Sequence, residues 1–129
     1  MCIDDGLLDN YVVTKILELS GMSRQTISFR SAGEALEYLE RNAETPSLIP
    51  DIILLDIQMP DMTGFDFLEA YGSLPEKVTG RCDLFLLSSS IDRADKSLAE
   101  CSEFVRRMLI KPLNIEELKA FYDNEPDAA

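Results

Sequence analysis

Residues that could bind a cation and an anion follow four apolar segments of this 129-residue sequence. They are Asp4 and Asp5 after residues 1–3, Asp56 after 52–55, Ser88, Ser89 and Ser90 after 84–87, and Lys111 after 108–110. Three carboxylates that lie close together cannot all stay ionised without a counter-cation. Carboxylate oxygens select Mg²⁺ or Mn²⁺ over zinc. A lysine and a hydroxyl facing such a cation would bind an anion, and this combination is what phosphoryl transfer requires.

Asp56 could itself act as the nucleophile, because carboxylates form aspartyl-phosphates. Taken singly, these residues have ordinary structural alternatives. An aspartate after a strand can cap a helix or a turn, a serine can bond to the backbone, and a lysine is most often solvated. Their joint position at the ends of four segments favours the functional interpretation.

The apolar pattern predicts the elements that position these residues. Continuous apolar runs at 52–55 and 84–87 are typical of strands covered on both faces, as in parallel sheets. Shorter strands are expected at 1–3, 25–30 and 108–110. Helices are expected at 7–20, 32–39, 63–72, 92–102 and 115–122, the first with Leu8, Val12, Ile16 and Leu19 at helical spacing. The expected helix caps are Ser31 with Glu34, Asp92, and Asn114 with Glu117.

Five alternating strand and helix segments predict a parallel sheet with helices on both faces. In open sheets of this kind, ligands bind beyond the carboxyl ends of the strands. The four groups of polar residues would therefore meet at one edge of the sheet.

Charge and composition exclude several functions. The chain has 24 acidic and 12 basic residues and a net charge of −12, which disfavours binding to nucleic acid or to an anionic membrane. It contains no histidine, so imidazole-based catalysis is excluded, and any phosphohistidine would lie on another protein. Its three cysteines form no C-x-x-C motif and are expected to be buried thiols in a reducing cytoplasm. We expect no signal peptide and no apolar run long enough to span a membrane.

Four motifs resemble the receiver domain of bacterial two-component response regulators. They are Ile3-Asp4-Asp5, PDIILLDIQMPDMTG at 50–64, LLSSS at 86–90 and IKPL at 110–113. The resemblance covers nearly the whole chain and implies an α/β, flavodoxin-like (βα)5 three-layer sandwich whose five parallel strands have the order 2-1-3-4-5. With only three residues before Asp4, the first strand would be shortened. The receiver domain is expected at 1–124, with a frayed tail at 125–129 and no output domain.

The resemblance also implies a role for each residue of the site. Asp56 is expected to accept a phosphoryl group, while Asp4, Asp5, Asp56 and the backbone carbonyl of Gln58 bind Mg²⁺, or Mn²⁺ in its place. Ser88 and Lys111 would contact the phosphoryl group. Ser88 would also take part in switching, in which Met108 occupies the position of the usual aromatic residue. Gln58, Ser89 and Ser90 would tune dephosphorylation, and a cis peptide bond is expected before Pro112.

The implied function is a cytoplasmic signalling switch that is not an enzyme. It would take a phosphoryl group from a histidine kinase or a histidine phosphotransfer protein and signal to a further protein that the sequence does not identify. It would be a monomer or a weak phosphorylation-dependent dimer.

Two alternatives remain open. A Mg²⁺-dependent phosphatase working through an aspartyl-phosphate usually needs a second acid two residues after the nucleophile, where this chain has Gln58. A degenerate receiver would bind partners without phosphorylation, which the short first strand and Met108 leave open.

Overall fold

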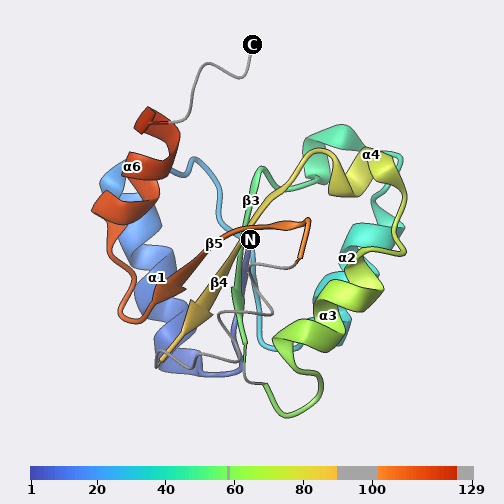
Figure 1. The fold of residues 1–129 in the computed structure, drawn as a ribbon, viewed down its shortest axis with the longest axis horizontal. Coiled ribbons are helices and arrows are strands. Elements are labelled where there is room, and N and C mark those ends of the chain that lie inside the picture. Colours follow the sequence, from blue (N-terminus) through green and yellow to red (C-terminus); the bar gives the residue numbers. More distant parts are fainter. Residues whose placement is uncertain (58, 90–101, 125–129) are drawn as a thin grey trace.

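Five parallel strands form one sheet in the computed structural model, which describes residues 1–57, 59–89 and 102–124 (Figure 1). The strands are β1 (Cys2–Ile3), β2 (Ser28–Phe29), β3 (Ile52–Asp56), β4 (Asp83–Ser88) and β5 (Val105–Ile110). Their order in the sheet is β2-β1-β3-β4-β5. The predicted α/β fold, the strand order and the short first strand are confirmed. Strand β2 is shorter than the predicted 25–30, because β1 offers only two residues for pairing.

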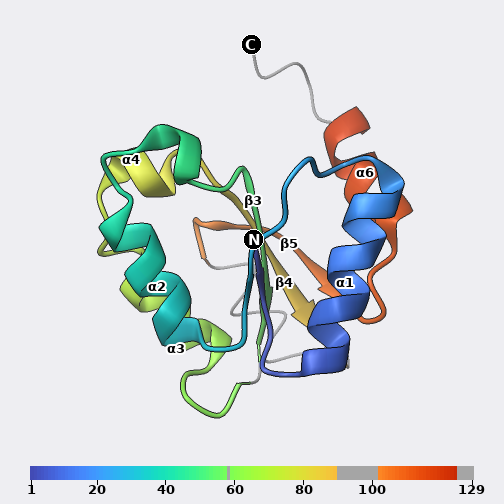
Figure 2. The same ribbon diagram turned by 180° about the vertical axis from the view of Figure 1, so that it is seen from behind.

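Helices cover both faces of this sheet (Figures 1 and 2). They are α1 (Leu7–Ser20), α2 (Ala32–Arg41), α3 (Gly64–Tyr71), α4 (Glu76–Thr79) and α6 (Ile115–Asn124), with a 3-10 turn, η1, at Pro46–Leu48. Helices α1 and α6 lie on one face, and α2 and α3 lie on the other. Residues 92–101 of the helix predicted at 92–102, with its cap Asp92, and the tail predicted at 125–129 lie outside the described residues, and Ser102 is not helical.

The two short elements η1 and α4 are not predicted by the sequence. They have three and four residues, and so few residues carry no helical periodicity. None of the helices in the described ranges combines the length and the apolar character needed to cross a bilayer.

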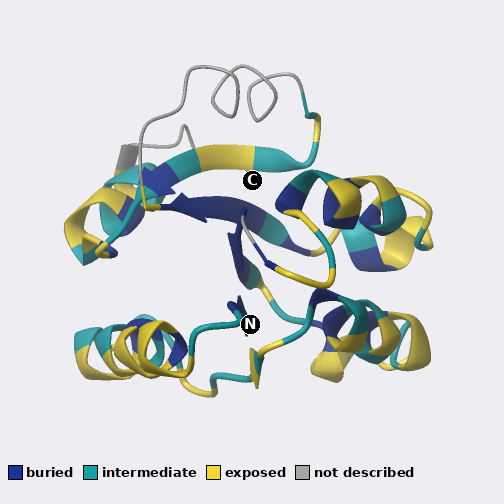
Figure 3. Cartoon of the chain, turned by 90° about the horizontal axis from the view of Figure 1, so that it is seen from below, coloured by how far each residue is buried: buried dark blue, intermediate teal, exposed yellow. Residues whose placement is uncertain are grey.

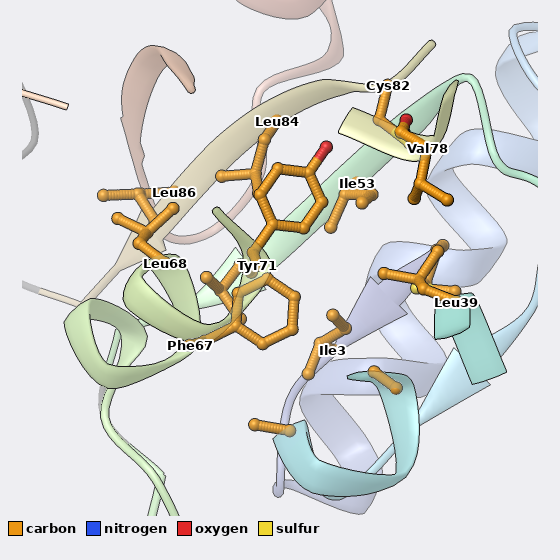
Figure 4. Close-up of a cluster of buried hydrophobic side chains, with 14 of the residues drawn as sticks. Ile3, Leu39, Ile53, Phe67, Leu68, Tyr71, Val78, Cys82, Leu84 and Leu86 are labelled. Atoms are coloured by element: carbon orange, nitrogen blue, oxygen red, sulfur yellow. The ribbon is translucent and has the colours of Figure 1, made fainter. Parts of the chain in front are cut away.

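Two apolar clusters, one on each face of the sheet, form the core. Figure 3 shows the buried residues along the central strands and on parts of the surrounding helices. Successive residues of β3 alternate between the two clusters: Ile53 and Leu55 share a cluster with residues of α2 and α3, and Leu54 shares the other with residues of α1 and α6. The α2/α3 cluster includes the stacked rings of Phe67 and Tyr71, whose centroids are 5.8 Å apart (Figure 4). This alternation explains why β3 is apolar at every position before its last residue.

Helix α1 buries a different face from the one that its apolar spacing predicts. Leu8 and Leu19 are 72% and 86% exposed, whereas Asn10 and Val13 are buried. The Asn10 amide donates hydrogen bonds to a carbonyl directly after β1 (2.9 Å) and to one in β2 (3.1 Å). These bonds turn a polar residue inward and leave Leu8, Val12 and Leu19 of the predicted stripe on the surface. Its fourth member, Ile16, is partly buried and packs against the cluster that α1 and α6 share, as predicted.

The segment between β3 and α3 is attached to the start of α2. The Asp61 carboxylate accepts hydrogen bonds from the Ser31 hydroxyl (2.9 Å) and from the Gly33 amide (3.3 Å). The Ser31 hydroxyl oxygen accepts a bond from the Glu34 amide (3.3 Å), so the predicted Ser31 cap is present. Burial alone would raise the pKa of Asp61, but the hydrogen bonds from Ser31 and Gly33 outweigh it and lower the pKa. Asp61 therefore fixes the segment between β3 and α3 to the start of α2.

Gly64 lies at the start of α3, where the chain approaches β3 closely. A Cβ at Gly64 would lie 2.8 Å from the Ile57 Cα, whereas a Cβ at Gly33 would meet nothing nearer than 3.7 Å. We expect Gly64→Ala to lower the free energy of unfolding by about 1–3 kcal/mol, because the backbone would have to move. Gly33→Ala should raise it by about 0.5–1 kcal/mol, because alanine favours the helix. Urea unfolding measures both, and a Gly64→Ala protein as stable as the parent would contradict the close approach.

Candidate functional site

The carboxyl ends of β1 and β3 bring three aspartates together. Asp4 and Asp5 directly follow β1, and Asp56 is the last residue of β3, the strand next to β1. One carboxylate oxygen of each lies within 4.8 Å of the others. The parallel register that pairs Ile3 with Leu55 sets this approach. Because Asp4 and Asp56 are buried, water screens their charges poorly.

Lys111 supplies positive charge at the same edge of the sheet. Its Nζ donates to Asp4 Oδ2 at 2.8 Å and to Asp9 Oδ2 at 3.3 Å, and it lies 3.6 Å from Asp56 Oδ1. Burial alone would lower the pKa of Lys111, but the hydrogen bond with Asp4 and the negative charges of Asp56 and Asp4 outweigh it and raise the pKa. The ammonium therefore stays protonated and connects the ends of three strands.

The remaining predicted residues that the structure describes lie at the ends of β4 and β5. Ser88 is the buried last residue of β4, and its carbonyl oxygen accepts a hydrogen bond from the Lys111 amide at 2.7 Å. Ser89 is exposed. The Lys111–Pro112 peptide bond is cis. Met108 is half-buried on β5 and packs against the α2/α3 cluster.

Two residues of α1 belong to this site although the sequence pattern does not indicate them. Asp9 pairs with Lys111, and Asn10 holds the backbone carbonyl of Asp4. The Gly6 amide adds a hydrogen bond to Asp4 Oδ1 at 2.9 Å. Helical spacing does not relate Asp9 to Asp4 and Asp5, because both precede α1, so no sequence signal indicates Asp9. No signal indicates Asn10 either, because a single asparagine in a helix is usually solvated.

The three aspartates fit a hard divalent cation. Carboxylate oxygens are the ligands that Mg²⁺ prefers in proteins, and those of Asp4, Asp5 and Asp56 converge at one place. Gln58, whose backbone carbonyl is predicted as a further ligand, lies outside the described residues, as does Ser90.

A cavity of about 390 Å³ lies at the opposite ends of the strands. Met1, Ile27 and Ile52 line it, together with other residues that precede β2 and β3. It shares no residue with the acidic cluster. The chemistry of the described residues therefore gathers at the carboxyl ends of the strands, as is usual in parallel α/β sheets.

Comparison with known protein families assigns the chain to one of them. Residues 1–123 match the response regulator receiver domain. The chain belongs to the response regulator receiver domain family. The resemblance predicted from four motifs is thereby confirmed over nearly the whole chain. Receiver domains of two-component systems generally act as switches controlled by phosphotransfer and interact with histidine kinases or phosphotransfer proteins.

Solved structures and curated relatives agree with this family. A response regulator receiver protein from Dyadobacter fermentans is 38% identical over 94% of both chains, with a TM-score of 0.81. A two-component response regulator from Cytophaga hutchinsonii is 28% identical, covers 95% of this chain and 91% of its own, and has a TM-score of 0.86. The two-component response regulator ARR5 of Arabidopsis thaliana is 25% identical over 96% of this chain and 68% of its own length. The relatives of this receiver thus include plant as well as bacterial proteins.

Removing the Lys111 ammonium would leave Asp4 and Asp56 without the positive charge that compensates them. The side chains of Lys111 and Asp4 are 16% and 5% exposed. We expect Lys111→Gln to lower the free energy of unfolding by about 2 kcal/mol at roughly neutral pH, less than the ~3–5 kcal/mol typical of fully buried pairs. The pKa of Lys111 is raised above 10.5 in the folded state. The difference in unfolding free energy between the parent and Lys111→Gln should therefore persist up to about pH 10.5 and diminish as the pH rises through the raised pKa of the folded protein.

Urea unfolding from neutral to strongly alkaline pH measures this effect. Lys77→Gln is the matched control, because its ion pair with Glu44 is exposed and should contribute less than about 0.5 kcal/mol. A Lys111→Gln protein that unfolds like the control would show that the ion pairs of Lys111 do not stabilise the fold.

Proposed function

We propose that this receiver is a phosphorylation-dependent switch that accepts a phosphoryl group on Asp56. One observation carries this assignment: the buried Asp56 carboxylate lies within 4.8 Å of those of Asp4 and Asp5 and 3.6 Å from the Lys111 ammonium. A nucleophile in this position has ligands for a cation beside it and the positive charge of Lys111 close by. The phosphodonor would be a phosphohistidine on a histidine kinase or a histidine phosphotransfer protein, because this chain has no histidine.

The acidic cluster would hold the metal that receiver domains generally use. Asp4, Asp5, Asp56 and the backbone carbonyl of Gln58 would be its protein ligands, with Mg²⁺ or Mn²⁺ bound. Such a cation stabilises negative charge on phosphoryl oxygens. The Gly6 amide fixes the Asp4 carboxylate for this purpose through its 2.9 Å hydrogen bond.

Transfer to Asp56 forms one bond and breaks one. A carboxylate oxygen of Asp56 attacks the phosphorus, a P–O bond forms, and the P–N bond to the donor imidazole breaks. The electron pair of that bond stays on the imidazole nitrogen, which takes up a proton from solvent. Lys111 and the Ser88 hydroxyl would bind the phosphoryl oxygens and stabilise the charge that remains on them.

The ends of β4 and β5 would pass the change on to a downstream protein. The Lys111 amide donates a hydrogen bond to the Ser88 carbonyl, so a displacement at the end of β4 would also move the end of β5. Met108 lies two residues before the last residue of β5. Its side chain would fill the gap that opens when Ser88 is displaced, because an unbranched thioether adapts to irregular gaps.

Gln58, Ser89 and Ser90 would set the lifetime of the phosphorylated state by orienting or excluding water. The switch would act in the cytoplasm, as a monomer or as a weak dimer formed on phosphorylation. Cys2 and Cys82, which are buried free thiols, are suited to a reducing compartment.

The first helix offers a docking surface for the phosphodonor. Five of its large apolar side chains are exposed, namely Leu7, Leu8, Tyr11, Val12 and Leu19. Scattered apolar side chains are common on surfaces, but Leu7, Leu8, Tyr11 and Val12 are spaced three or four residues apart on neighbouring turns of α1, and such a group of apolar side chains suits an interaction site. This α1 patch begins two residues after the acid pair. A helix seated on it would carry a histidine to within reach of Asp56.

A small phosphodonor with Mg²⁺ tests the phosphoacceptor directly. The parent protein should gain one phosphoryl group, measured by intact mass, and Asp56→Asn should gain none, because an amide is a poor nucleophile. Asp123→Asn makes the same substitution at an exposed aspartate of α6 and should be labelled like the parent. Equal labelling of Asp56→Asn and the parent would contradict the assignment of Asp56 as the phosphoacceptor.

The two alternative functions predict different results in this assay. Sustained release of phosphate from a generic phosphoester would indicate a phosphatase. A parent protein that neither binds Mg²⁺ in a titration nor becomes labelled would indicate a degenerate receiver.

Leu8→Ala should slow phosphotransfer from a protein phosphodonor and leave labelling by a small phosphodonor unchanged. Leu8 is 72% exposed, so the fold does not depend on it. We expect a loss of about 1 kcal/mol, roughly fivefold in kcat/KM, as for a central interface residue. Leu48→Ala, at an exposed leucine of η1, is the control. Equal rates for the two variants would place the docking surface elsewhere.

A further inference from the structure

We propose that Asp9 is a positioning residue for Lys111, which holds the ammonium away from the phosphoacceptor and competes with the phosphoryl group for it. This inference rests on the proposed function, in which Lys111 binds a phosphoryl group on Asp56. Asp9 lies in the first turn of α1, and Lys111 directly follows β5. Their contact at 3.3 Å therefore connects two elements that are far apart in the sequence.

Three carboxylates surround the Lys111 ammonium at unequal distances. Its Nζ donates to Asp4 at 2.8 Å and to Asp9 at 3.3 Å, but it lies 3.6 Å from Asp56, beyond ordinary hydrogen-bond range. The phosphoacceptor is thus the most distant of the three. In this structure the ammonium is held toward α1 and the end of β1.

Phosphorylation would change which partner Lys111 prefers. A phosphoryl group carries a charge of about −1.5 to −2, so it attracts the ammonium more strongly than a carboxylate does. The ammonium has three N–H donors, so it can turn one toward the phosphoryl group, and we expect its movement from the present 3.6 Å separation toward Asp56 to lengthen at least one of its two hydrogen bonds. Asp4 is buried and belongs to the acidic cluster, whereas the Asp9 side chain is 57% exposed. Water can replace the ammonium on Asp9 at little cost, so Asp9 is the partner that is released.

Gly6 provides the space for this contact. A Cβ at Gly6 would lie 3.3 Å from Asp4 Oδ1 and 3.4 Å from Asp9 Oδ2, so a side chain there would crowd both carboxylates. Asp9 also has an ordinary role, because a negative charge in the first turn of a helix interacts favourably with the helix dipole. That role affects stability but does not involve Lys111, and the two can be separated by experiment.

Binding of beryllofluoride, a stable mimic of the phosphoryl group, tests the competition in the presence of Mg²⁺. Dissociation constants from ¹⁹F NMR are compared for the parent, Asp9→Asn and Glu18→Gln, which removes the same charge near the other end of α1. Asp9→Asn should bind about two- to fivefold more tightly, because one exposed ion pair no longer holds Lys111 back. Glu18→Gln should bind like the parent, and an Asp9→Asn protein that binds no more tightly overturns the proposal.

A second comparison separates positioning of Lys111 from simple charge repulsion. In a Lys111→Met background, Asp9→Asn should bring no further gain, because the ammonium is absent. A gain that persists there overturns the proposal. Proton exchange of the Lys111 ammonium, followed by ¹⁵N NMR of the free protein, gives an independent measurement if Lys111→Met binds too weakly. Exchange should be faster in Asp9→Asn, and unchanged exchange also overturns the proposal.

The outcomes distinguish this inference from the function on which it rests. A parent protein that binds no beryllofluoride would refute the proposed function and the role of Asp9 with it. Tight binding by the parent together with an unaltered Asp9→Asn would refute only the role of Asp9. If lower thermal stability is the sole effect of Asp9→Asn, this residue serves the start of α1 alone.

Discussion

Repulsion among three carboxylates at the edge of the sheet is the constraint on which the site depends. Asp4, Asp5 and Asp56 approach within 4.8 Å, and two of them are buried. Like charges at such a distance persist only where cations compensate them. Lys111 supplies one positive charge and hydrogen-bonds Asp4, but it leaves the cluster with an excess of negative charge. That excess is why the three aspartates fit a divalent cation.

The sheet topology makes this compensation possible. Asp4 and Asp56 come from neighbouring strands, whereas Lys111 follows β5, which β3 and β4 separate from β1. A long, flexible lysine side chain can bridge that separation, and the parallel arrangement places all the strand ends on the same side. The apolar clusters on both faces keep the strands in register, so that the approach of the charges is imposed by packing rather than by the charges themselves.

Helix α1 joins the site to the surface. Its first turn presents Asp9 to Lys111 and turns Asn10 inward, where the amide holds the chain that carries Asp4. The apolar α1 patch faces outward along the same helix. Asp4, Asp5, Asp9, Asp56 and Lys111 account for only part of the net charge of −12, so the exposed apolar side chains of α1 are a local exception in a strongly acidic chain.

The sequence by itself determined the sheet and most of the site. The apolar runs of β3 and β4 can be covered only on both faces, and polar residues after parallel strands must meet at one edge. Asp4, Asp5, Asp56, Ser88 and Lys111 are therefore predictable from their positions alone.

Only the tertiary structure decided how α1 faces the sheet and which of its residues enter the site. Leu8, Val12 and Leu19 fit a buried stripe as well as Val13 does, so helical spacing could not distinguish the two faces. Asn10 turns inward because it finds two carbonyl acceptors, and these are brought together only when β1 and β2 pair. Asp9 and Lys111 are 102 residues apart in the chain, and a contact of that range exists only once the whole sheet has formed.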